Sequence, residues 1–150
     1  MMELTDLNPF VIDRVAPGVV KEKSTNGLLN IFVVENGHEV TVNRWAEAVK
    51  QTLLEWTTNQ PCFLLHDLHK SGRAALDAHM HEDFQALYNL RGDMERYVAF
   101  VMPQGSIDLA RMESELLAIK EKRSGTSRIH WSMFADRKEA LRWLMEHMPN

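Results

Sequence analysis

The sequence contains one cysteine, and the lack of a second excludes an intramolecular disulfide. Cys62 lies within the apolar run of residues 62–65, where a thiol is a small hydrophobic side chain. We therefore expect a buried structural cysteine in a protein of a reducing compartment.

Long apolar runs are also missing. No stretch approaches the roughly 20 apolar residues of a membrane-spanning helix. The start of the chain, MMELTDLNPF, lacks the basic and apolar regions of a secretion signal. The sequence thus predicts a cytoplasmic protein without a membrane span.

Basic charge is not in excess, since 21 acidic residues stand against 17 lysines and arginines and the formal net charge is −4. A nucleic-acid-binding surface needs clustered basic groups that displace counterions from phosphates. The motifs of common catalytic and nucleotide-binding sites are absent as well: there is no Gly-x-Ser-x-Gly elbow, no His-Glu-x-x-His and no glycine-rich phosphate loop. We expect no nucleic-acid partner, no cofactor and no enzyme activity.

What the sequence does contain is an alternation of apolar runs with helix-period segments. Its 150 residues are 45% apolar and 25% charged, an ordinary composition for a single globular domain that covers residues 1–150. Strands are expected at residues 28–35, 62–65, 97–102 and 129–134. A helix-period segment follows each of them, the first through Val42, Trp45, Val49 and Leu53.

Turn and cap residues predict where these elements end. After Asn36-Gly37 the chain either pairs back or leads directly into a helix capped by Thr41 or Asn43. Proline disfavours helical backbone before it, so residues 59–61 end this helix. Ser71 and Gly72 open the second helix, which Gly92 stops; Ser106 or Asp108 caps the third, and Asp136 caps the last.

Strands separated by helices of this length predict an α/β fold with a mostly parallel sheet and helices packed against it. The turn after the first strand and the uncertain N-terminal segment together indicate at least one antiparallel strand at an edge. Residues 1–27, punctuated by proline and glycine, are expected to form an edge strand or a hairpin arm.

The order of elements resembles the STAS and SpoIIAA-like superfamily, named for anti-sigma factor antagonists of bacteria. RYVAFVMP (residues 96–103) is similar to a central strand of the SpoIIAA-like branch, and MFADRKEALRWL (133–144) to its closing strand and helix. The strand of residues 62–68 falls in register. The resemblance implies a STAS/SpoIIAA-like domain and a noncatalytic bacterial regulatory protein that binds a protein partner.

The resemblance also implies a site. In antagonists of that superfamily a partner kinase phosphorylates a serine at a helix start, within an Asp-Ser-Ser-Gly pattern. The corresponding residues here read His69-Lys70-Ser71-Gly72, so Ser71 and Gly72 match and Lys70 replaces the first serine. Because ligands of open α/β sheets gather where strands end, we expect a partner-binding switch loop at Asp67, His69, Lys70, Ser71 and Gly72. The alternative is that Ser71 is a plain N-cap.

The same region is rich in potential metal ligands and catalytic groups. His66, His69, His79 and His81 occur with Asp67, Asp77, Glu82 and Asp83, but strand and helix periodicity places them on different faces. We expect no metal site, and histidines in solvent paired with helix carboxylates. Ser71, His69 and Asp67 are too close along an extended segment to converge as a catalytic triad.

A second functional hypothesis is a carrier or sensor of a small apolar, lipid-like ligand held between the sheet and the helices. Trp45, Trp56 and Phe84 are the candidate pocket residues, because they lie on the helices that flank the expected switch loop. Core packing is the alternative fate of these side chains. The sequence leaves a homodimer open.

Overall fold

A six-stranded sheet forms the centre of the computed structural model, which describes residues 10–79, 86–87, 90–108, 111 and 128–149. The strands lie in chain order: β1 (Val11–Ala16), β2 (Val19–Lys23), β3 (Leu29–Val34), β4 (Cys62–Asp67), β5 (Arg96–Val101) and β6 (Ile129–Phe134). β1, β2 and β3 pair antiparallel, whereas β3 to β6 pair parallel. The predicted fold class is confirmed, and the expected hairpin arm is the β1–β2 hairpin.

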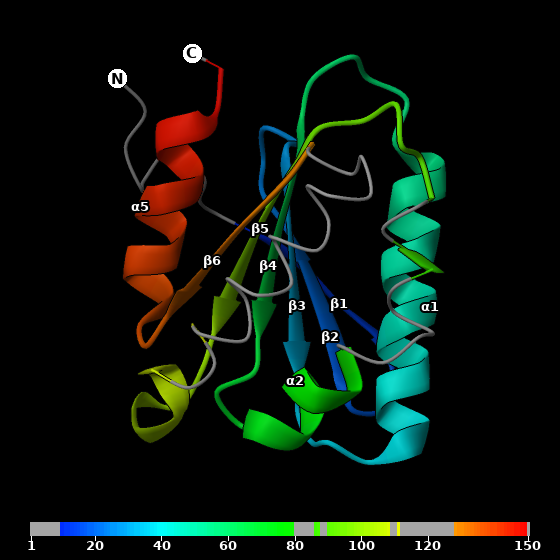
Figure 1. The fold of residues 1–150 in the computed structure, drawn as a ribbon. Helices are drawn as coiled ribbons and strands as arrows, with labels where there is room; N and C mark the ends of the chain where they lie inside the picture. Colours follow the sequence, from blue (N-terminus) through cyan, green and yellow to red (C-terminus); the bar gives the residue numbers. More distant parts are fainter. Residues whose placement is uncertain (1–9, 80–85, 88–89, 109–110, 112–127, 150) are drawn as a thin grey trace.

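The helices cover the two faces of the sheet unequally. α1 (Glu39–Glu55) and α2 (Gly72–His79) pack on one face, and α5 (Arg137–His147) covers the other (Figure 1). The parallel strands follow one another in one direction, so crossovers of the usual right hand place their helices on the same face. Among the described helices, the one after the last strand covers the opposite face, where Phe10 also packs.

The central strands are buried on both sides, as the apolar run at residues 62–65 predicts. In β4, Cys62 and Leu64 pack toward α1, while Phe63 and Leu65 pack toward α5. Burial raises the pKa of the Cys62 thiol to about 12, and the prediction of a buried structural cysteine is confirmed.

The start of α1 differs from the prediction. The helix begins at Glu39, with His38 at the N-cap position and no side-chain cap, so neither Thr41 nor Asn43 caps it. The Asn36 side chain accepts a hydrogen bond from the His38 amide (3.0 Å) and turns the chain into the helix earlier than expected.

The end of α1 and the start of α5 can also be compared with the sequence prediction. α1 ends at Glu55, earlier than the predicted end at residues 59–61, because Trp56 already has extended backbone. Asp136 caps α5 as predicted and accepts from the Lys138 amide at 2.7 Å. Before the helix expected to begin at Ser106 or Asp108, the structure has the 3-10 turn η2 (Gln104–Ser106), and residues 107–108 and 111 are helical, so Asp108 lies inside the helix and does not cap it; residues 109–110 and 112–127 lie outside the described part. No helix in the described ranges is long and apolar enough to cross a membrane.

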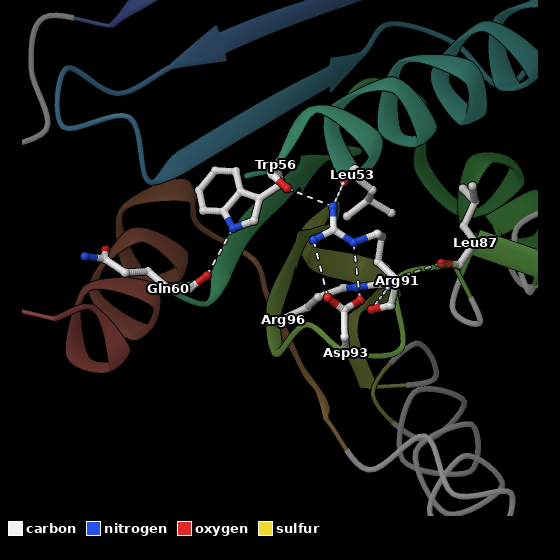
Figure 2. A network of polar contacts seen from close by, with 7 residues as sticks. All are labelled: Leu53, Trp56, Gln60, Leu87, Arg91, Asp93 and Arg96. Atoms are coloured by element: carbon white, nitrogen blue, oxygen red, sulfur yellow. Dashed lines mark hydrogen bonds and ion pairs between the residues drawn. The ribbon is translucent and has the colours of Figure 1, made fainter. Parts of the chain in front are cut away.

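Arginine side chains close the amino-terminal edge of the parallel strands (Figure 2). Arg91, rather than Gly92, takes the left-handed backbone conformation before β5, with a φ of 59°. Its guanidinium donates to the Trp56 carbonyl (2.8 Å) and to the Leu53 carbonyl (3.0 Å), which also accepts from the Trp56 amide (3.4 Å), and it forms an ion pair with Asp93. These hydrogen bonds explain why Arg91 rather than a glycine occupies the left-handed position, because the turn directs its side chain toward α1.

Candidate functional site

The predicted switch loop lies where β4 leaves the sheet. The Leu68 amide donates to the Val101 carbonyl (2.8 Å), and the Gly72 amide donates to the Leu68 carbonyl (2.6 Å), which closes a tight turn before α2. Ser71 directly precedes the helix, at the edge to which the parallel strands point their carboxyl ends. Gly72 has a φ of 64°, a conformation that favours glycine.

Asp67 is held by the protein itself. One carboxylate oxygen accepts from the His69 amide (3.1 Å), and the other lies 3.9 Å from the Arg137 guanidinium. Arg137 donates two hydrogen bonds, of 2.7 and 3.1 Å, to the Glu22 carboxylate on β2. Asp67 therefore ties the loop to the start of α5 and to the hairpin.

The remaining loop residues divide by exposure. His69 and Lys70 are exposed, whereas the Ser71 hydroxyl is buried and has no hydrogen-bond partner in the part of the chain that the structure describes. Of the predicted loop, only His69 and Lys70 extend side chains into solvent. In this conformation the Ser71 hydroxyl is not available to a kinase.

Two histidines expected in solvent are buried instead. His66 on β4 is 1% exposed and His79 on α2 is 3% exposed, so the interpretation of both as solvent-facing partners of carboxylates is wrong. The predicted helix partner Asp77 pairs with Arg73 at 2.8 Å, while His81, Glu82 and Asp83 lie outside the described residues. Within the described ranges, no three metal-ligating side chains converge.

The sequence carried a signal for this burial. His79 follows Leu76 by three residues and Ala75 by four, which places it on the buried stripe of α2. His66 lies two residues after the core residue Leu64 on β4 and therefore on the same buried face of the strand.

The buried histidines belong to an aromatic cluster under α1. The Trp45 indole nitrogen donates to His66 Nδ1 at 3.1 Å, and the Trp45 ring stacks on the His79 ring with centroids 5.2 Å apart. Phe100 contacts both histidines, at 5.2 and 4.8 Å. Because His66 Nδ1 accepts this bond, the ring is the neutral tautomer protonated at Nε2. Burial lowers the pKa of His66 to about 3, and burial together with the neighbouring His66 lowers that of His79.

The predicted apolar pocket is filled by packing in the described structure. Trp45 is 0% exposed and Trp56 is 8% exposed, and both belong to the core under α1. The cavity lined by His66 and His79 measures about 20 Å³, room for about one water molecule. Phe84 lies outside the described residues, so its predicted role is untested.

A larger hollow lies elsewhere, between the β1–β2 hairpin and the exposed side of α1. This hairpin groove has a volume of about 570 Å³ and is lined by Val15, Ala16, Lys21, Val40, Asn43, Arg44, Glu47, Ala48 and Gln51. Gly18 in the hairpin turn, with a φ of 86°, allows close contact with α1, since a Cβ there would lie 2.8 Å from Thr41 Cγ2. The sequence did not predict the groove because residues 1–27 could not be placed on the sheet.

An ion pair at the carboxyl edge of the sheet links β1 to the surroundings of the switch loop. Arg14, which precedes the groove residue Val15, forms an ion pair with Glu35 at the end of β3. The hydrogen bond from Arg14 lowers the pKa of Glu35, and the charge of Lys70 in the loop lowers it further. Glu35 thus interacts with both β1 and the switch loop, although it does not line the groove.

Comparisons of the chain with models of known protein families, with curated proteins and with solved structures returned no match. The resemblance to the SpoIIAA-like branch therefore stays a prediction.

The buried hydrogen bond between Trp45 and His66 predicts coupled stability effects. Trp45→Phe and His66→Phe each remove one partner of this buried hydrogen bond and should each lower the free energy of unfolding by about 2–4 kcal/mol. The double variant removes both groups, so urea unfolding should give a cost smaller than the sum by about 1 kcal/mol or more. Trp56 is the control, because its indole donates to the Gln60 carbonyl and not to His66. The unfolding free-energy losses of Trp56→Phe and His66→Phe should therefore add without coupling. Additivity in both pairs would contradict the prediction.

The buried histidine pair also predicts a pH dependence of folding. His66 and His79 stay neutral in the folded protein, whereas the unfolded chain protonates them below their ordinary pKa of 6.5. Stability is therefore complete above pH 6.5 and is lost as the pH falls toward 3, by about 1.4 kcal/mol per pH unit for each histidine. Chemical unfolding between pH 6 and 5 should show this slope, and His66→Phe should halve it. An unchanged slope in that variant would refute the assignment.

Ser71 can be distinguished from a plain N-cap by stability. Ser71→Ala removes a buried hydroxyl without a partner and should leave the free energy of unfolding unchanged or raise it by up to about 1 kcal/mol. Asp136→Ala is the matched control, because it removes a cap that is used and should cost about 1 kcal/mol. Equal losses in thermal unfolding would show that Ser71 is an N-cap only.

Proposed function

We propose that this protein is a noncatalytic regulatory module that binds a partner protein through the hairpin groove and the aliphatic side chains beside it. The main support for this proposal is that exposed apolar side chains cluster on β1 and at the start of α1. The described part of the chain has five large exposed hydrophobic side chains, and three of them lie on the α1 side of β1 or on the first turn of α1: Val11 (67% exposed), Val15 (40%) and Val40 (57%). Apolar surface gathered in this way is typical of an interaction site.

The charges on β1 argue against a second copy of the chain as the partner. β1 is the edge strand, so two copies could pair antiparallel about an axis perpendicular to the sheet. The two registers that pair most of the strand place Asp13 opposite Asp13 or Arg14 opposite Arg14. Like charges directly opposite destabilise a strand pair, and the irregularity between Arg14 and Ala16 disturbs the edge further. A different protein fits this surface better than a homodimer.

Regulation is the second part of the proposal and rests on the resemblance. A phosphate on Ser71 would require the buried hydroxyl to turn outward, which would disturb the turn held by the Leu68 carbonyl and Asp67. The charge of Lys70 in the loop acts on Glu35, and Glu35 pairs with Arg14 on β1. Opening of the loop would thereby weaken this contact and disturb β1, the strand that carries the groove residue Val15.

Site-specific photo-crosslinking in the host cell tests the binding surface. A photoreactive side chain at Val11 or Val40 should give an adduct with the same partner protein, because both positions border the proposed contact. A probe at Arg142, exposed on α5, is the matched control and should give none. Val15→Ser, a change of an exposed side chain, should reduce the Val40 adduct at least fivefold.

Two outcomes would contradict the proposal. An adduct of twice the chain's own mass would identify a second copy, and equal labelling from Val40 and Arg142 would show that the hairpin side has no partner of its own.

A further inference from the structure

We infer that the hairpin groove holds a linear segment of the partner in which an aliphatic side chain lies next to an aspartate or glutamate, whose carboxylate pairs with Lys21. This inference rests on the proposed function and specifies the chemistry of the bound segment.

Lys21 is the observation that points to an acid. The lysine is partly buried on β2, and its ammonium lies 5.9 Å from the centre of the Phe32 ring. No carboxylate of the described chain lies within ion-pair distance of it, although Glu55 and Asp13 act on it from farther away. Burial lowers the pKa of Lys21, because its ammonium is partly desolvated. A carboxylate from a partner would supply a direct counterion.

The apolar walls point to the second group. Val15 and Ala16 of the hairpin face Val40 and Ala48 of α1 across the groove. The two alanines leave width for a branched aliphatic side chain, and covering these walls removes apolar surface from water. Lys21 lines the same groove, so the aliphatic group and the carboxylate would be close neighbours on the bound segment.

The groove rim agrees with a peptide as the occupant. Lys21 and Arg44 line the groove with positive charge and Glu47 with negative charge. Asp13 lies opposite Lys21 in the β1–β2 register without reaching ion-pair distance, so the ammonium can still pair with a carboxylate of the segment. Arg44 also donates to the Pro17 carbonyl at 3.4 Å, which holds the hairpin turn against α1. The amide of Asn43 is exposed at the rim and can donate to or accept from a peptide backbone. The groove is open to solvent rather than enclosed, a form that suits a chain segment.

Selection of a displayed library of random 12-residue peptides on the full chain tests the inference. We expect enriched peptides with Asp or Glu within two positions of Leu, Ile or Val. A synthetic peptide of the enriched sequence should bind Lys21→Met at least tenfold more weakly than the unchanged protein. Lys23→Met is the matched control, because Lys23 is exposed two residues farther along β2 and does not line the groove; its affinity loss should stay below threefold.

The variants are expected to fold, since Lys21→Met removes a charge that is already partly buried. Circular dichroism spectra of the three proteins should agree. Enriched peptides without an acid, equal binding by Lys21→Met, or no enrichment at all would each overturn the inference. If the Val40 crosslink persists in such a case, the interaction function stands and only the chemistry of the segment is wrong; if the crosslink also fails, both are wrong.

Discussion

The hydrogen bond from Trp45 to His66 joins the first helix to the centre of the sheet, and the surrounding packing depends on it. In the buried core, each of these polar groups needs the other, because an unpaired buried donor or acceptor costs about 1–3 kcal/mol. His79 stacks on Trp45 and thereby places α2 beside α1. The pair therefore sets the rotation of α1, and with it the side of α1 that faces outward.

The strand order decides that the outward side of α1 becomes one wall of the hairpin groove. Successive parallel strands move in one direction, so α1 and α2 share a face and α5 covers the other. The hairpin extends the sheet beyond β3, where α1 covers it incompletely, and the hairpin groove remains between them. An open apolar groove is thus a consequence of adding two antiparallel strands to the edge of this sheet.

Much of this architecture is readable from the sequence. Buried runs such as residues 62–65 predict strands because apolar periodicity follows from burial, and Asp136 predicts a helix start because its carboxylate satisfies a local amide. Features that depend on contacts between residues far apart in the sequence cannot be predicted from local patterns. His66 acquires its partner 21 residues away, and Arg91 takes a left-handed conformation to reach α1 35 and more residues earlier. The groove brings residue 15 next to residue 40, and only the register of the hairpin decides that contact.

The rigidity of the core and the openness of the groove act together. Gly18 and Thr41 hold the hairpin against α1, and the Trp45–His66 bond holds α1 against the sheet, so both groove walls are in place before a partner arrives. A preformed groove spares the entropy of ordering its walls, and the bound segment alone must be ordered. The half-buried charge of Lys21 is costly in the free protein, and a carboxylate that neutralises it regains that cost on binding. Selectivity for an acidic segment thus follows from an unfavourable feature that the free protein retains.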